Sequence, residues 1–205
     1  MSLFITLEGP DGGGKSTQAK DLAAHLRTTG VDVLLTREPG GTLIGDQIRK
    51  VLMSLDNAGM LPQAEFLLFS ASRAQLVQEV IRPHLERGGV VVCDRFYDSS
   101  LAYQGYGHQL DLEVLRTITT FVTGGLKPDL TLLLDLPVEA GLGRRRETGH
   151  WNRLDDYNVD FHRRIRQGYL VMAEADRRRW VIVDATRPMD QVQADIRSIV
   201  AGRLA

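Results

Sequence analysis

The stretch from residue 9 to residue 16 has the residue types and the spacing that bind the phosphates of a nucleotide. It lies directly behind the apolar run Leu3–Leu7 and reads Gly9-Pro10-Asp11-Gly12-Gly13-Gly14-Lys15-Ser16, followed by Thr17. Glycines let such a loop turn its backbone N–H groups around phosphate oxygens, and the helix that follows adds the positive end of its dipole. Lys15 then reaches the β- and γ-phosphates, while the Ser16 hydroxyl holds Mg²⁺. The stretch predicts a loop that binds a nucleoside triphosphate, as switches, motors and kinases all do.

A second polar pair follows another apolar run. Val90–Cys93 is followed by Asp94 and Arg95, which places a carboxylate and a guanidinium at the edge of the sheet where ligands of open α/β folds bind. Asp94 can orient Mg²⁺ or its water, and Arg95 can bridge phosphates. Taken alone, a helix cap at Asp94 and a surface ion pair at Arg95 explain the pair equally well.

Apolar runs typical of buried strands recur along the chain, separated by segments with helical character. They are Leu3–Leu7, Val31–Leu35, Val90–Cys93, Leu130–Leu136 and Trp180–Val183. Strands that alternate with helices form a parallel sheet covered on both faces, so these runs predict an α/β fold with a five-stranded parallel sheet. Pro62 is positioned to open a long helical segment that ends at Gly88, and Pro83 inside it is expected to kink or stop the helix.

Length and composition are those of one ordinary globular domain. The chain has 205 residues, a net charge of −1 and an apolar fraction of 43 %, which predicts a single unit over residues 1–205 with no nucleic-acid or membrane partner. No apolar stretch approaches the ~20 residues of a membrane span, and the first residues lead directly into a strand. The expected location is therefore the cytoplasm. The lone Cys93 is expected to be a buried thiol, and the five histidines lack the spacing of a metal site.

Several segments together resemble one family, the thymidylate kinases. Asp94–Gly105, which reads DRFYDSSLAYQG, is similar to the family's signature segment, and Thr36–Thr42 is similar to a second one. Further matches, in the family's order, are Phe69–Arg73, Asn152–Asp155 and Asp184–Thr186. The resemblance implies a P-loop nucleoside-monophosphate-kinase fold, a homodimer, and transfer of the γ-phosphoryl group of ATP to dTMP, with Mg²⁺ at Ser16 and Asp94.

The resemblance also implies roles for single residues. Asp11 is similar to a carboxylate near the deoxyribose 3′-hydroxyl and the attacking phosphate, and Arg37 and Arg95 resemble a clamp on that phosphate. Phe69 resembles the residue that stacks on thymine, and Arg73, four residues later on the same helical face, resembles the one that hydrogen-bonds the base. The residues implied around the base edge and the sugar are Ser99, Ser100, Tyr103 and Gln104. Without the family, Phe69 is more simply a core aromatic in an apolar run.

The arginine-rich stretch after the fourth strand, at about residues 141–155, resembles the mobile lid of the family. Some members carry a catalytic arginine in the phosphate loop and others carry it in the lid. The loop interior here has no basic residue, so the lid is expected to supply this cation. The predicted catalytic residues are Lys15, Asp94, Arg95, Arg146 and Arg153, with Arg144 in the ATP site. A further arginine run, Arg177–Arg179, is expected to be a solvated face.

Other functions compete for the same phosphate loop. A GTPase needs an Asn-Lys-x-Asp guanine reader, and the asparagines at 57, 152 and 158 precede Ala, Arg and Val, which excludes that class. A kinase for another monophosphate, such as dUMP, dGMP or a modified pyrimidine, stays open, because only the shape of the base pocket separates it from a dTMP kinase. A non-catalytic nucleotide-binding module stays open as well, and it would bind ATP without turnover.

Overall fold

The centre of the protein is a twisted parallel sheet. The computed structural model describes residues 2–147, 149 and 151–204; Thr148 and His150 of the predicted lid lie outside the described residues. The strands are β1 (Leu3–Glu8), β2 (Val33–Arg37), β3 (Val90–Asp94), β4 (Leu130–Asp135) and β5 (Trp180–Asp184). They pair in parallel in the order β2-β3-β1-β4-β5, which confirms the predicted five-stranded parallel sheet.

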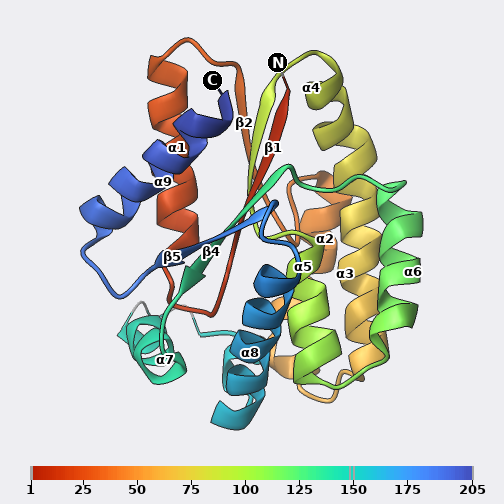
Figure 1. The fold of residues 1–205 in the computed structure, drawn as a ribbon. Coiled ribbons are helices and arrows are strands. Elements are labelled where there is room, and N and C mark those ends of the chain that lie inside the picture. Colours follow the sequence, from red (N-terminus) through yellow and green to blue (C-terminus); the bar gives the residue numbers. More distant parts are fainter. Residues whose placement is uncertain (1, 148, 150, 205) are drawn as a thin grey trace.

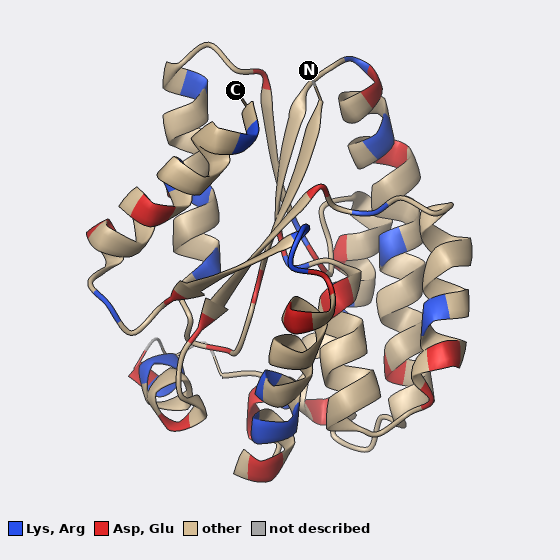
Figure 2. Cartoon of the chain, viewed as in Figure 1, with Lys and Arg blue, Asp and Glu red and all other residues tan. Residues whose placement is uncertain are grey.

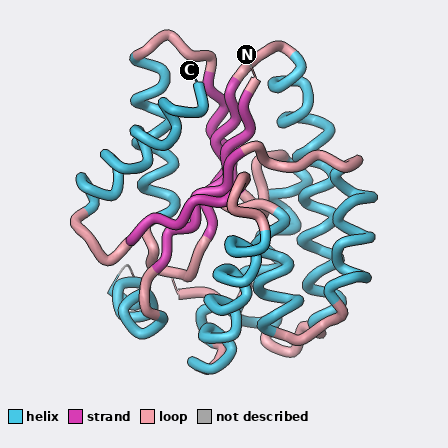
Figure 3. Tube along the Cα trace, in the orientation of Figure 1, coloured by secondary structure: helices cyan, strands magenta, loops and turns pink. Residues whose placement is uncertain are grey.

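Helices cover both faces of this sheet (Figure 1). One face carries α1 (Lys15–Thr28) and α9 (Met189–Leu204). The helices on the other side are α2 (Leu43–Met53), α3 (Pro62–Leu76), α4 (Arg82–Glu86), α5 (Tyr97–Ser100), α6 (Leu112–Thr123) and α8 (Val159–Ala175). Figure 3 shows the strands as a single band between these two layers. Within the described part of the chain, no helix is both long and apolar enough to cross a membrane.

The strands are apolar on both faces because each face has its own core. Phe4 and Val91 belong to one buried cluster, and the neighbouring residues Ile5 and Val92 belong to another. Successive side chains of a strand point to opposite faces, so the two clusters fill the spaces above and below the sheet. Continuous apolar runs in the sequence are the expected consequence.

Every strand ends on a charged residue. The last residues are Glu8, Arg37, Asp94, Asp135 and Asp184, and Figure 2 shows the acidic ends of β4 and β5 at the lower edge of the sheet. Because all strands run in parallel, these charges gather along one edge. The apolar runs of the sequence therefore stop where the polar site begins.

The long helical segment after Pro62 is not stopped by Pro83. α3 begins at Pro62, as predicted, and continues through a π-helical turn, Val77–Ile81, into α4. A π turn shifts the backbone hydrogen bonds by one residue, and Pro83 lies at the start of the segment after it, where its missing N–H is tolerated. Gly88 follows the end of the segment in the left-handed region, with φ 85°.

Two other residues test the predictions about the surface and the core. Cys93 is fully buried, and burial raises the pKa of its thiol well above the ordinary value, as expected for a structural cysteine. The prediction of a solvated face is wrong for Arg179, whose guanidinium forms two hydrogen bonds with the buried Asp98, at 2.6 and 3.1 Å. Arg179 lies just before β5, next to α5, and this proximity is a tertiary feature that its sequence neighbours do not reveal.

Candidate active site

A cavity of about 470 Å³ lies at the carboxyl edge of the sheet. It is bounded by the phosphate loop, the ends of β2 and β3, helix α3, the π-helical segment η3 (Leu101–Gly107) and the lid helix α7 (Val138–Glu147). The predicted site residues that line it are Asp11, Gly12, Gly14, Lys15, Ser16, Thr17, Arg37, Phe69, Asp94, Arg95, Ser99, Ser100, Tyr103, Gln104 and Arg144. Segments far apart in the sequence thus meet at one place, as the motif analysis expected.

The phosphate loop turns tightly and packs directly against the lid helix. Gly12 and Gly14 have φ values of 76° and 80°, in the region where a side chain is strained. A Cβ atom on Gly12 would lie 2.0 Å from the carbonyl oxygen of Gly141 in α7. This backbone contact gives a physical reason for a loop interior without an arginine at position 12, because a side chain there would push the lid helix away.

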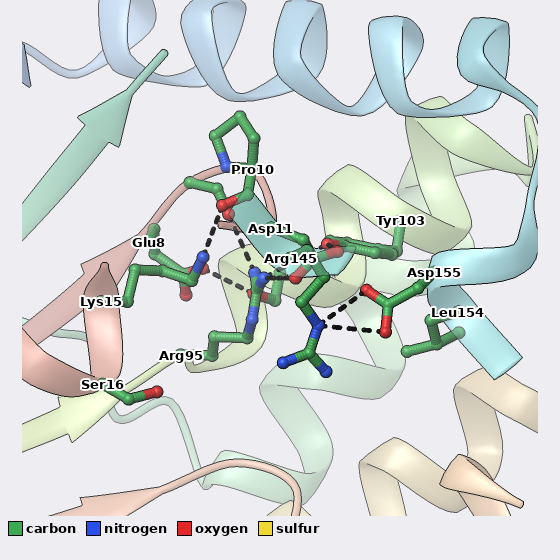
Figure 4. Close-up of polar contacts among 12 residues, drawn as sticks. Glu8, Pro10, Asp11, Lys15, Ser16, Arg95, Tyr103, Arg145, Leu154 and Asp155 are labelled. Atoms are coloured by element: carbon green, nitrogen blue, oxygen red, sulfur yellow. Dashed lines mark hydrogen bonds and ion pairs between the residues drawn. The ribbon is translucent and has the colours of Figure 1, made fainter. Parts of the chain in front are cut away.

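Lys15 is buried at the start of α1. Its Nζ atom donates a hydrogen bond to the carbonyl oxygen of Pro10 at 2.6 Å, so the side chain lies back across the loop (Figure 4). Burial, and then the nearby charge of Arg95, lowers the pKa of Lys15 to about 8. A cation held in this position is oriented before a phosphate arrives, and a new anion would stabilise its charge.

Ser16 and Asp94 are brought together, as their assignment to one metal site requires. The Ser16 hydroxyl donates to Oδ2 of Asp94, across 78 residues of sequence. A hydroxyl and a carboxylate are hard oxygen ligands, and Mg²⁺ in nucleotide sites is held by one or two such groups together with phosphates and water. The pair fits that ion.

Arg95 is the centre of the hydrogen-bond network at the end of β3. Its backbone is in the left-handed region, with φ 69°, a conformation that costs free energy in a non-glycine residue and that concentrates at functional sites. The guanidinium forms an ion pair with Asp11 at 2.5 Å and donates to the hydroxyls of Tyr103 and Tyr169 at 3.2 and 3.0 Å. Although burial acts in the opposite direction, Arg95 and Lys15 hold the pKa of Asp11 well below its usual range.

A buried carboxylate behind Arg95 holds this network in place. Glu8, at the end of β1, accepts hydrogen bonds from the Phe96 N–H at 2.7 Å, the Ser99 hydroxyl at 2.6 Å and the Tyr169 hydroxyl at 3.0 Å. Burial, followed by the charge of Asp98, raises the pKa of Glu8 to about 7. Sequence analysis did not assign Glu8, although its position as the polar end of an apolar strand was a usable signal.

Three arginines line the end of the cavity next to β2 and β3, which we call the phosphate end. Arg37 and Arg95 were predicted there, and Arg49 of α2 lines the same cavity without having been predicted. Arg49 donates to the Pro39 carbonyl at 2.9 Å. Burial, and then the charge of Arg37, lowers the pKa of Arg49. Arg37 pairs with Asp46 at 3.1 Å and Arg95 with Asp11. Arg49 has only a carbonyl partner in the hydrogen bonds described, so a phosphate bound here would neutralise further positive charge.

The other end of the cavity, which we call the base end, is lined by Phe69, Ser100 and Gln104. Phe69 is half-buried, lines the cavity and belongs to neither apolar cluster, so it is not the core aromatic that the run around it favours. One helical turn later, Arg73 is 1 % exposed and is paired with the buried Glu38 at 2.7 Å. Its Nη2 atom also donates to the Ser100 hydroxyl at 2.9 Å.

Two polar atoms of the residues implied to read the base are buried without a hydrogen-bond partner among the described residues, although only Gln104 lines the cavity and Arg73 lies behind its lining. They are Nη1 of Arg73 and Oε1 of Gln104. The amide nitrogen of Gln104 donates to Glu65 at 2.6 Å. A buried polar atom without a partner costs about 1–3 kcal/mol, and one donor together with one acceptor is a suitable pair for the edge of a base.

The lid arginines are distributed differently from the prediction. Arg144 and Arg145 line the cavity; Arg144 donates to the Ala185 carbonyl at 2.9 Å, and Nε of Arg145 lies 3.1 Å from both carboxylate oxygens of Asp155. Figure 4 shows Nε of Arg145 facing both carboxylate oxygens of Asp155. Arg145 was not among the predicted catalytic residues.

Arg146 and Arg153, which were predicted to be catalytic, do not line the cavity. Arg146 is exposed, and its guanidinium lies 5.4 Å from the centre of the Trp151 ring. Arg153 is 3 % exposed, donates to the Leu52 carbonyl at 3.0 Å and pairs with Glu65 at 2.5 Å. Successive residues of a helix point about 100° apart, so one step along α7 separates a side chain in the cavity from one in solvent.

The site lies at the carboxyl edge of a parallel sheet, where open α/β folds bind nucleotides. A phosphate loop between β1 and α1, a hydroxyl–carboxylate pair for a metal ion and a cavity rich in arginine are the parts of a P-loop phosphotransferase for nucleotides. The family model for thymidylate kinase matches residues 7–196 of the chain. The chain belongs to the thymidylate kinase family.

Individual relatives agree with this assignment. A thymidylate kinase of Deinococcus radiodurans is 55 % identical over 204 residues, which cover 99 % of this chain and 98 % of that protein. A thymidylate kinase of a Roseiflexus species is 49 % identical over 217 residues, covering 100 % and 96 %. The crystal structure of thymidylate kinase from Ehrlichia chaffeensis superposes with a TM-score of 0.79 at 32 % identity, covering 97 % of this chain and 98 % of that one.

Proposed function

We propose that this protein transfers the γ-phosphoryl group of ATP to dTMP, giving dTDP and ADP. The observation that carries the choice of acceptor is that a donor on Arg73, one helical turn from Phe69, and an acceptor on Gln104 are both buried without a partner among the described residues. Thymine offers a carbonyl oxygen at C4 and an N–H at N3, which complement a donor and an acceptor in that order. Cytosine offers an amino group and a bare ring nitrogen at the same positions, and would leave both protein groups unpaired at about 1–3 kcal/mol each.

The acceptor phosphate is held at the opposite end. Arg37, Arg49 and Arg95 neutralise its charge, and Asp11 lies beside the sugar. An oxygen of this phosphate attacks the γ-phosphorus, and the bond from that phosphorus to the β–γ bridging oxygen breaks as ADP leaves. The attacking oxygen is already ionised, so the reaction needs positioning and charge neutralisation rather than a base.

The donor phosphates lie in the loop from Gly9 to Thr17. Lys15 neutralises charge that grows on the transferred group and on the bridging oxygen. Ser16 and Asp94 hold Mg²⁺, with Asp94 as an organiser of the metal and its water. The ion would supply positive charge that offsets the charge of the phosphates.

Arg144 and Arg145 supply the remaining cations from the lid. This choice of arginines is supported by their position, because both line the cavity, whereas Arg146 and Arg153 do not. The Arg144 side chain extends from α7 to the carbonyl of Ala185 after β5, a position that suits contact with the nucleoside part of ATP. Arg145 lines the same cavity as Asp11 and Lys15, which suits the transferred phosphoryl group.

The family resemblance also leads us to propose a homodimer located in the cytoplasm, where both nucleotides are present. Exposed apolar side chains on adjacent helices support the dimer: Leu67 of α3 is 54 % exposed, and Val114 and Phe121 of α6 are 53 % and 85 % exposed. Val114 and Phe121 are seven residues apart and share one helical face. Sedimentation equilibrium of the wild type and of Phe121→Glu tests this: a wild-type protein that is monomeric at micromolar concentration excludes the dimer.

The direct test is an assay of ADP release with ATP, Mg²⁺ and a panel of monophosphates: dTMP, dUMP, dCMP and dGMP. We expect dTMP to be used with the highest kcat/KM, and dCMP and dGMP to be poor acceptors. Uracil presents the same edge as thymine, so dUMP is the rival that the donor and acceptor pair alone does not reject. ATP binding without ADP release for any acceptor would instead indicate a non-catalytic nucleotide-binding module.

A further inference from the structure

Glu65 of α3 is a buried carboxylate between the lid and the base end of the cavity. Its side chain is 0 % exposed. Oε1 accepts a hydrogen bond from Nε2 of Gln104 at 2.6 Å and lies 3.4 Å from Nε2 of His108. Oε2 lies 2.5 Å from Nη2 of Arg153 and accepts from the Tyr157 hydroxyl at 3.4 Å. Oε1 is therefore the oxygen that faces the Gln104 amide, and Oε2 is the oxygen that faces the Arg153 cation.

The carboxylate is ionised at neutral pH. Burial raises the pKa of Glu65, but the hydrogen bonds from His108 and Gln104 and the charge of Arg153 outweigh it and bring the pKa below its ordinary value. An ionised carboxylate only accepts hydrogen bonds. Arg153 therefore acts here as the counter-ion that keeps Glu65 charged.

This charge leaves one orientation for the Gln104 amide. An amide has a donor end and an acceptor end, and only the donor end can face a carboxylate. Nε2 of Gln104 must therefore point at Glu65, so Oε1 must point away from it. That oxygen is buried, has no partner among the described residues and belongs to a side chain that lines the cavity.

We propose that Glu65 sets the base specificity of this enzyme by fixing the orientation of the Gln104 amide. Gln104 touches the base, and Glu65 is a positioning residue that acts through it. The inference rests on the proposed function, because an acceptor atom selects bases that carry an N–H at N3, as thymine and uracil do, over cytosine, which carries a bare nitrogen there.

Glu65→Gln tests this, because the new amide has a defined orientation of its own. The guanidinium of Arg153 requires an oxygen at the position of Oε2, so the amide nitrogen takes the position of Oε1 and donates toward Gln104. The Gln104 amide then turns its oxygen toward this new donor and presents its N–H₂ group to the base. This arrangement opposes the N3–H of thymine and fits the bare nitrogen of cytosine.

The measurement is kcat/KM for dTMP and dCMP in the wild type and in Glu65→Gln. We expect the ratio of dTMP to dCMP to fall by at least roughly tenfold, the effect of one mispaired buried hydrogen bond, with dTMP impaired and dCMP unchanged or improved. An unchanged ratio, or an equal loss for both acceptors, overturns the proposal. A wild type that does not phosphorylate dTMP refutes the proposed function instead, so the two failures are distinguishable.

Two further variants separate positioning from general damage. In a Gln104→Met background, Glu65→Gln should leave the ratio unchanged, because the group through which Glu65 acts is gone; an additional change in the ratio contradicts the proposal. Tyr157→Phe removes a different hydrogen bond from the same carboxylate and should keep the wild-type ratio. If Glu65→Gln does not fold, Glu65→Asp, which keeps the charge for Arg153 and withdraws the oxygen from Gln104, is expected to lower the ratio in its place.

Discussion

The phosphate end and the base end of the cavity are formed by different kinds of groups. At the phosphate end, backbone N–H groups of the glycine loop and the charged groups of Lys15, Arg37 and Arg95 lie within short segments that directly follow strands. At the base end, Arg73 and Gln104 are oriented by the buried carboxylates Glu38 and Glu65, which come from other parts of the chain.

This difference divides the work of the enzyme. The phosphate end recognises charge, which every nucleoside monophosphate carries, so changes there should alter turnover for all acceptors alike. The base end recognises one arrangement of a donor and an acceptor, so changes there should alter the choice between acceptors. Substitutions at the two ends of the cavity therefore test this division.

Removing the loop cation should give the largest loss. Lys15→Met keeps the length of the side chain and removes the charge, and we expect kcat to fall by about 10²–10³-fold, as for the loss of one preorganised donor to a transition-state anion. The fall should be equal for dTMP and for any slower acceptor. Lys20→Met, at an exposed position of the same helix, is the matched control and should keep the wild-type kcat.

The lid arginines sharpen the description of the phosphate end. We expect Arg145→Met to lower kcat by at least about 30-fold, because a cation supplied in this way can be worth 10³-fold or more and Arg144 partly replaces it. Arg146→Met should remain close to the wild type. If Arg146→Met lowers kcat and Arg145→Met does not, the prediction from the sequence that Arg146 is catalytic is supported instead. That result would mean that α7 rotates during the reaction.

A change at the base end should affect discrimination. Gln104→Met removes the acceptor and should lower kcat/KM for dTMP by roughly tenfold while changing dCMP little, the cost of one buried hydrogen bond. Gln104 is a better test than Arg73, because truncating Arg73 leaves Glu38 buried without its cation, at a cost of about 3–5 kcal/mol in stability. Equal losses for the two acceptors would contradict a role in reading the base.

The smallest effect concerns the carboxylate behind Arg95. The pKa of Glu8 is raised by burial, and then by Asp98, from 4.5 to about 7, so the folded chain retains a proton that the unfolded chain releases. Its contribution to stability is fully present below pH 4.5 and is lost as the pH rises through 7. Urea unfolding across this range should show the free energy of unfolding of the wild type falling relative to that of Glu8→Gln as the pH rises, and a difference independent of pH would contradict it.

Sequence patterns predicted the phosphate end well because its residues are local. The glycine loop, Asp94 and Arg95 directly follow apolar strands, and parallel strands bring their carboxyl ends to one edge. The parallel sheet with helices on both faces follows from the same apolar runs, whereas the order of its strands was not predicted. Even at this end, sequence periodicity does not predict that Lys15 is buried or that Arg49 of α2 lines the cavity, because both depend on tertiary packing.

The base end and the lid were predicted less completely because they depend on long-range pairs. Glu65 meets Gln104 across 39 residues and Tyr157 across 92, and a lone glutamate in the first turn of a helix is usually exposed. In the lid, adjacent arginines differ only in the direction that the helix gives them. That direction is set by the contact between Gly12 and Gly141, which fixes how α7 lies on the loop.

The most direct test of this division compares kcat/KM for dTMP and dCMP in the wild type, Lys15→Met and Gln104→Met. We expect Lys15→Met to lower both values by the same factor and to keep their ratio, whereas Gln104→Met should lower the value for dTMP and reduce the ratio. If Lys15→Met changes the ratio, or Gln104→Met lowers both values equally, the two ends of the cavity do not work separately and the account is wrong.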